Sequence, residues 1–179
     1  MVVSCMLLLT GCFGSAESAG SSTPLPSPTG TWTEPATDAA EGPQTPAPVP
    51  TETAAVDAPV EFSTGVTVAI DKVSAISVTA TTPGEISGSA VSVTVRVTND
   101  SNAPVNLDSA VVNLTAEDGA YGVGTTAGDP QPFVGDIAPG ASATGTYVFM
   151  LEPAAGRSVN VIVNYGAGEP LAVFTGKTS

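Results

Sequence analysis

The side chains that can do chemistry are few in this 179-residue sequence. It has no histidine, and its two cysteines, Cys5 and Cys12, both lie within the first dozen residues. Without histidine the usual general base and the commonest metal ligand are missing, and the rest of the chain has no thiolate nucleophile. Only carboxylates, hydroxyls, lysines and tyrosines remain. We therefore predict a non-catalytic protein that holds no cofactor.

Cys12 closes a motif at the end of a short apolar run. Residues 1–10 are mostly apolar, and they are too few to span a bilayer, which takes about 20 residues. They have the character of a signal-peptide core. The sequence Leu9-Thr10-Gly11-Cys12 that ends this run resembles the bacterial lipobox, in which the cysteine thiol receives a diacylglyceryl group before cleavage. We predict a signal peptide at residues 1–11, lipid attachment at Cys12 and a location on the outer face of the cell membrane.

The start of this signal departs from the usual pattern. No Lys or Arg precedes the apolar run, although a signal peptide normally begins with positive charge. We therefore expect the true start of the protein to lie upstream.

Acidic side chains are the remaining candidates for hydrolysis. A glycosidase-like pair of carboxylates could come from Asp108, Glu117, Asp118 or Glu152. Most of these lie at predicted turns, where carboxylates cap backbone groups and face water. We predict no catalytic residue, and a carboxylate-based extracellular hydrolase stays a residual alternative.

A calcium site and a serine–lysine dyad have little support in the sequence. Calcium takes oxygen ligands, and Asp118, Asp129 and Asp136 surround a Gly-rich loop, but the alternating aspartates of a calcium-binding loop are missing. Lys72 and Lys177 could each activate a serine, yet nothing in the sequence positions either of them. We predict no metal site, and calcium binding is left open.

The charge balance limits the class of partner. The formal net charge is −13, and the basic residues are Lys72, Arg96, Arg157 and Lys177. Nucleic acid requires a basic stripe, and anionic lipid requires a basic cluster, so neither is expected to bind through charge. We expect the membrane to be reached through the lipid on Cys12 alone. The sequence does not decide the oligomeric state.

The composition divides the chain into a tether and a domain. Residues 12–59 are rich in Ser, Thr, Ala, Gly and Pro, with prolines recurring from Pro24 to Pro50. Such a segment cannot bury enough apolar surface to offset its ordering entropy, so we predict a disordered linker at residues 12–59 and a folded domain at residues 60–179. Glycosylation of the linker is not determined by composition.

The domain has the pattern of an all-β protein. In Ala90 to Asn99, Val91, Val93, Val95 and Val97 alternate with polar residues, which predicts a strand with one buried face. Further strands are predicted at residues 66–73, 74–80, 111–116, 144–151, 159–165 and 171–175, separated by turns rich in Gly, Pro, Asn and Asp. Seven or eight strands are enough for two packed sheets, so we predict an antiparallel Ig-like β-sandwich.

Three segments of this domain resemble a known family. They are Ser89 to Ser101 with its alternating valines, the acidic turn Ala116-Glu117-Asp118-Gly119, and Ile137-Ala138-Pro139-Gly140 ahead of Thr146-Tyr147-Val148-Phe149. Together they resemble the DUF4352, telokin-like family of immunoglobulin-like domains in exported Gram-positive lipoproteins. The resemblance covers residues 65–174 and implies the fold and an exported location. Its motifs mark turns and core positions, so it implies no catalytic residues.

One stretch is predicted to be a loop that could bind a partner. Gly122 to Asp136 is rich in Gly and Pro around Phe133, which predicts an extended loop at one end of the sandwich, where such folds place recognition surfaces. In the alternative interpretation, Phe133 folds back into the core.

Two classes of function follow. In the first, a cell-surface lipoprotein displays a non-catalytic binding or adhesion module for an envelope protein or a cell-wall ligand. In the second, an envelope accessory protein stabilises or regulates another exported protein.

Overall fold

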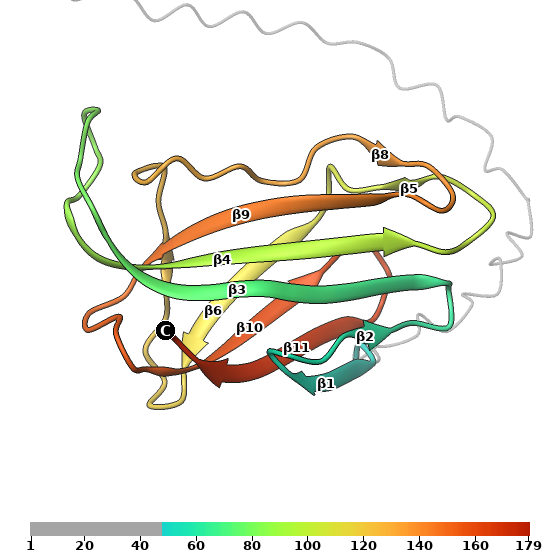
Figure 1. Cartoon of the computed structure of the whole chain (residues 1–179), viewed down its shortest axis with the longest axis horizontal. Coiled ribbons are helices and arrows are strands. Elements are labelled where there is room, and N and C mark those ends of the chain that lie inside the picture. Colours follow the sequence, from blue (N-terminus) through green and yellow to red (C-terminus); the bar gives the residue numbers. More distant parts are fainter. Residues whose placement is uncertain (1–47) are drawn as a thin grey trace, which may run out of the picture. The chain divides into compact units, whose positions relative to one another are not determined.

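The valine-alternating segment forms the central strand of the larger of two β-sheets. The structure, a computed structural model, describes residues 48–179. The five-stranded sheet B has the order β2 (Val60–Glu61), β3 (Val66–Val78), β4 (Gly88–Asn99), β9 (Ser142–Met150) and β7 (Val123–Gly124). The four-stranded sheet A has the order β1 (Thr51–Ala55), β11 (Leu171–Lys177), β10 (Ser158–Asn164) and β6 (Val111–Ala116). A small pair, β5 (Val105–Asn106) and β8 (Asp136–Ile137), lies at one end (Figure 1).

The core lies between the two sheets. Val91, Val93, Val95 and Val97 of β4 are fully buried, as are Val161 and Val163 of β10 and Phe174 of β11. Each such side chain contributes roughly 1.5–3 kcal/mol when it is buried. The side chains at the alternating apolar positions therefore hold the two sheets together. The predicted Ig-like all-β sandwich is confirmed. Within the described residues, no helix is long and apolar enough to cross a membrane.

The strand count agrees with the prediction, but one pairing does not. Seven strands have five or more residues, and β2, β5, β7 and β8 have two each. The expected strands at residues 66–73 and 74–80 are one strand, β3, which a β-bulge between Ile70 and Lys72 interrupts. The extra residue, Asp71, accepts two hydrogen bonds from Arg96 of β4, the shorter of which is 2.6 Å long.

One strand pair differs from the prediction. Strands β1 and β11 run parallel, whereas the sandwich was expected to be antiparallel throughout.

The folded part begins earlier than residue 60, so the predicted boundary needs a correction. Residues 51–55, assigned to the linker, form β1, which pairs with β11 from Thr51↔Leu171 to Ala55↔Thr175. The backbone N–H of Val56 continues the ladder with a 3.0 Å bond to the Thr175 carbonyl. The side chains of Ala54 and Val56 pack on the core.

Both open sides of the sandwich are closed by segments that change sheets. On one side the chain passes from β1 in sheet A to β2 in sheet B. On the other, Tyr121 bridges Thr115 of β6, and the next residues form β7, which pairs with β9. We call residues 120–125 the crossing segment. It covers part of the edges of β6 and β9, edges that would otherwise expose unpaired backbone groups.

Candidate binding site

An exposed apolar groove lies beside the crossing segment. It has a volume of about 410 Å³ and is lined by Ile86, Ser87, Gly88, Ser89, Ala120, Tyr121, Met150, Leu151 and Glu152. Tyr121 is 78% exposed and Ile86 is 69% exposed, high values for large apolar residues. We call this the Tyr121 groove. Its walls come from three segments that are far apart in the sequence.

A glycine places Tyr121 at the surface. Gly122 passes between the sheet edges, where an added Cβ would lie 2.8 Å from Leu114 Cδ2 and 2.9 Å from Phe149 Cβ. No larger residue fits there without moving both neighbours. Because Gly122 faces the core, the adjacent Tyr121 faces outward, on the same side of sheet A as its partner Thr115.

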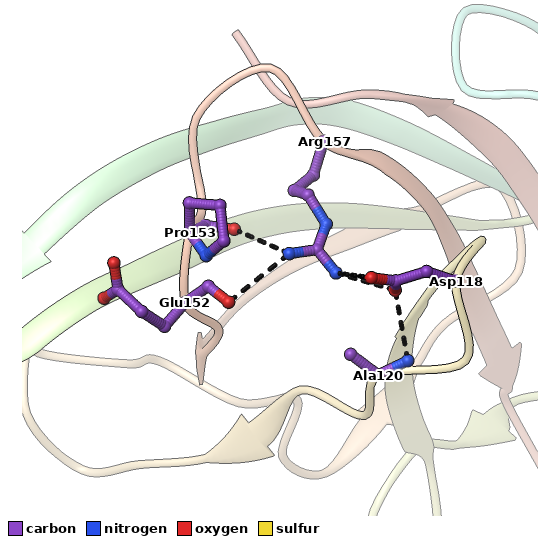
Figure 2. Close-up of polar contacts among 5 residues, drawn as sticks. All are labelled: Asp118, Ala120, Glu152, Pro153 and Arg157. Carbon is purple, nitrogen blue, oxygen red and sulfur yellow. Dashed lines mark hydrogen bonds and ion pairs between the residues drawn. The ribbon is translucent and has the colours of Figure 1, made fainter.

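Arg157 connects two of the three segments that form the walls of the groove. Its guanidinium donates two hydrogen bonds of 2.6 Å to the carboxylate of Asp118 and one of 3.3 Å to each of the carbonyls of Glu152 and Pro153 (Figure 2). Asp118 precedes Ala120 and Tyr121 on one wall, and Glu152 lies on the other. The Arg157 side chain is only 17% exposed. A planar guanidinium with several donors can hold such a geometry, and a lysine cannot.

The carboxylate of Asp118 is fixed from both sides. It accepts a 3.2 Å hydrogen bond from the backbone N–H of Ala120 in addition to those from Arg157. These hydrogen bonds hold the pKa of Asp118 below its ordinary value. The bond from the Ala120 N–H is the largest cause, and the bond from Arg157 is the second. This carboxylate therefore stays ionised and paired, which suits bracing rather than proton transfer.

Glu85 orders the loop that carries Ile86. Its carboxylate accepts hydrogen bonds from the backbone N–H groups of Thr81 (2.7 Å) and Thr82 (2.9 Å) and from the Thr126 hydroxyl (2.8 Å). These bonds, with the Thr81 N–H as the largest cause, lower the pKa of Glu85 from 4.5 to about 2. The loop at residues 79–87 is thereby tied to the loop at 125–128 and does not depend on packing alone.

One of the acidic residues considered for catalysis, Asp108, lies apart from the others, and another, Asp118, is held in an ion pair. Asp118 forms an ion pair with Arg157. Asp108 accepts a 2.6 Å hydrogen bond from the backbone N–H of Gly135, the residue before β8. This end of the sandwich is opposite the turn that follows β6 (Figure 1). Glu117 and Glu152 are exposed. In the part of the chain that the structure describes, no three acidic side chains gather as metal ligands, so Asp118, Asp129 and Asp136 are not brought together.

The two lysines and the buried Tyr165 have different surroundings. Lys177 lies opposite Ser158 in the ladder and Lys72 opposite Thr94, but no hydrogen bond joins either pair among residues 48–179. Tyr165 donates a 2.8 Å bond to Glu169, and 2.8 Å separates its hydroxyl from that of Thr64. Burial is the main cause that raises the pKa of Tyr165 to about 12, so its phenol stays protonated at neutral pH.

The side chain of Phe133 belongs to the core, although the residues on either side of it are exposed. It is 7% exposed, and its ring lies 6.0 Å from that of Tyr147, measured between centroids. The segment from 122 to 136 contains β7, a bridge between Gln131 and Thr146, and the start of β8, so it runs along β9. The expectation of an extended partner loop at Phe133 is corrected, and the alternative, in which Phe133 folds into the core, describes the structure. Cys12 lies outside the described residues.

Comparisons with known proteins reveal the fold alone. No family model matches the chain, and no curated protein matches it. The structure is similar to that of a candidate lipoprotein (ycdA) from Bacillus subtilis, with a TM-score of 0.54 and 20% identity over 69% of this chain. It is also similar to MPT63, a secreted protein from Mycobacterium tuberculosis, with a TM-score of 0.54 and 19% identity over 73% of this chain. This chain spans 39% of the Bacillus protein and 100% of the mycobacterial one. At such identities the similarity shows a shared β-sandwich fold.

Proposed function

We propose that this protein is an exported lipoprotein, held through Cys12 at the outer face of the cell membrane, that displays a non-catalytic Ig-like binding domain for an envelope protein. The observation that carries the binding role is the Tyr121 groove, where large apolar side chains are exposed on a braced scaffold. We place the domain with the DUF4352 lipoproteins on the three sequence segments described above.

The groove has the features of a protein-recognition site. Tyrosine offers a large contact area at a low cost in side-chain entropy, and exposed apolar patches mark interaction surfaces. Arg157 and Glu85 hold the walls, so little ordering is needed when a partner binds. The site is therefore prepared for contact rather than for reaction.

The charge around the groove defines the partner further. Glu152 lines the groove and is exposed, and exposed Glu117 lies in the turn that leads to Ala120. The nearby Arg157 is already paired with Asp118. An acidic rim attracts a cationic partner and repels other acidic proteins. We infer that the groove takes an extended segment in which an apolar side chain lies next to Lys or Arg.

Selection from a random peptide phage library tests this site. We expect enrichment of peptides that combine an apolar side chain with Lys or Arg. Ile86→Ser and Tyr121→Ala should each weaken the binding of a selected peptide about tenfold or more, since removing a central apolar contact costs ~1–2 kcal/mol.

Val134→Ser is the matched control, because Val134 is 80% exposed and does not line the groove. It should bind like the unmodified chain. Two results would exclude the groove as the recognition site. One is the selection of peptides that carry no basic residue, and the other is an equal loss of peptide affinity in Val134→Ser and Ile86→Ser.

Cys12→Ser tests the anchor. With the lipid in place the protein should sediment with membranes, because two acyl chains, unlike one, hold a protein stably. The Cys12→Ser protein should appear in the soluble fraction or the medium, whereas Cys5→Ser should stay with the membranes. Membrane-bound Cys12→Ser protein that still needs detergent for release would contradict lipidation at this residue.

A further inference from the structure

A second hollow lies on the side of the sandwich that the crossing segment closes. Its volume is about 340 Å³, and strands of both sheets contribute to its walls. We call it the side cleft, and no residue lines both it and the Tyr121 groove. Its lining includes Val112 of β6, Gly124 of β7, and Tyr147 and Phe149 of β9.

Val112 has a backbone donor and a backbone acceptor that the fold does not use. Strand β6 is the last strand of sheet A, next to β10. On its free edge, the N–H of Ala116 donates to the Ala120 carbonyl (2.7 Å). The N–H of Gly122 donates to the Leu114 carbonyl (2.9 Å) on the same edge. Because alternate residues of a strand direct their backbone groups to the same edge, the N–H and C=O of Val112 also point to this edge.

Nothing pairs with these two groups of Val112 in the part of the chain that the structure describes. After Gly122 the chain turns away from β6 and joins β9 as β7. The crossing segment therefore extends sheet A only beside the second half of β6. A place for a further short strand is left open beside the first half.

The inner wall of the side cleft has room for a side chain. Gly124 pairs with Phe149, which is buried in the core, so a side chain at position 124 would point to the same inner side of sheet B. A Cβ added to Gly124 would meet no atom within 4 Å, whereas one added to Gly122 would collide with Leu114. Protein interiors are close-packed, so this space is unusual next to a core residue.

We propose that the side cleft binds an extended segment of a partner protein, which adds an antiparallel strand beside β6 in line with the crossing segment. An extended backbone offers the acceptor and the donor that Val112 lacks. The residue that exchanges both hydrogen bonds with Val112, which we call the anchor residue, carries its side chain on the same face as Val112. It therefore fills the space in front of Gly124. The anchor residue is apolar, because it contacts Val112 and Phe149.

Tyr147 supplies a further polar contact. Its hydroxyl accepts a 3.2 Å hydrogen bond from the backbone N–H of Phe133, and its own proton has no acceptor among residues 48–179. Burial is the main cause that raises the pKa of Tyr147, so the proton stays on the oxygen at neutral pH. This hydroxyl can therefore donate to a carbonyl of the bound segment. The inference does not depend on the Tyr121 groove or on the segment proposed to bind there.

A second copy of the chain is a poorer match for the side cleft. If two β6 strands paired symmetrically about Val112, Ala110 of one copy would lie opposite Leu114 of the other, where Gly122 already lies. The net charge of −13 also disfavours the approach of two copies. A short segment that bends away after Val112 meets neither obstacle.

Peptide selection on a variant without the Tyr121 groove tests the proposal. The full chain carries Cys12→Ser, which prevents lipid attachment, and Ile86→Ser with Tyr121→Ala, which remove the exposed side chains of that groove. We expect a random peptide phage library to yield binders in which alanine substitution identifies one dominant apolar residue, the anchor residue. Methylating the backbone nitrogen of this residue should weaken binding at least about tenfold. Methylating either neighbouring nitrogen should change binding less than about twofold, because only alternate N–H groups face β6.

Gly124→Phe and Val123→Phe are the matched pair of protein variants. Gly124→Phe fills the side cleft from within and should weaken peptide binding at least about tenfold. Val123 is 64% exposed and does not line the cleft, so Val123→Phe should bind the peptide like the parent chain. Melting curves of both variants verify that they are folded.

Three results would overturn the proposal as far as binding is concerned. They are the absence of any enriched peptide, equal binding by Gly124→Phe and Val123→Phe, and equal effects of methylation at the three nitrogens. Two further results would assign the cleft to another occupant and overturn it equally. One is self-association in sedimentation that Gly124→Phe abolishes, and the other is displacement of the selected peptide by a synthetic peptide of residues 13–47.

Discussion

Val95→Asp should leave the protein unfolded, whereas Thr94→Asp, one residue away, should leave it folded. Val95 is 0% exposed in β4, where it lies opposite Ile70 of β3 and Gly145 of β9. An unpaired carboxylate there loses its hydration without gaining a partner, a cost of several kcal/mol or more. The total stability of a domain is about 5–15 kcal/mol, so this single change consumes most or all of it.

Thr94 differs because it faces the outside of sheet B. It is half-buried, and its cross-strand partners are Lys72 and Thr146. Aspartate at this position stays hydrated and lies opposite a cation. Far-ultraviolet circular dichroism and thermal melting of both variants would test the pair. Similar melting temperatures for the two would mean that the register of β4 is wrong by one residue, since such a shift exchanges the faces of a strand.

Starting the chain at residue 60 instead of residue 48 should lower the free energy of unfolding by roughly 2–4 kcal/mol, or the melting temperature by about 10 °C. The shorter chain loses the ladder of β1 with β11 and the bonds Leu171 N–H to Pro50 carbonyl (2.9 Å) and Val56 N–H to Thr175 carbonyl (3.0 Å). It also uncovers Gly176, next to which Val56 packs.

Denaturant unfolding of the two chains measures this difference. Limited proteolysis of the full chain gives an independent result, a stable fragment whose first residue lies before Thr51. A chain starting at residue 54 is the intermediate control, because it keeps Val56 and loses most of β1. Equal stability for the chains starting at 48 and 60, or a stable fragment beginning after residue 55, would show that β1 adds nothing to the sandwich.

The parts of this fold that the sequence predicts are those set by local alternation. The valines of β4 and of β10 alternate with polar residues, and each pattern identifies a strand and its buried face before any partner strand is known. β1 has no such pattern, because its Thr51 to Ala55 segment is exposed along most of its length. Its strand character depends on β11, more than 100 residues away, which composition does not reveal.

The candidate site escapes sequence reasoning for the same reason. Ile86, Tyr121 and Met150 come together only when the hairpin before β4, the crossing segment and the end of β9 meet, and none of these segments carries a local motif. The acidic turn Asp118-Gly119 is visible in the sequence, but its partner Arg157 is 39 residues away. In the sequence, the Gly and Pro residues around Phe133 indicate an extended loop. In the structure, the same segment follows β9 with only an isolated bridge between Gln131 and Thr146.

The parallel pairing of β1 with β11 has a mechanical consequence. The chain reaches the domain at Thr51, whose partner Leu171 begins β11, and β11 then runs to Lys177, opposite Ser158 and next to Arg157. The chain therefore enters at one end of the sandwich, and the Tyr121 groove lies at the other. Under the proposed function, a force between the lipid anchor and a partner held in the groove would act along the strand axis. It loads the hydrogen bonds from Thr51 to Ala55 in shear, all together, and does not peel β1 away from β11 one bond at a time.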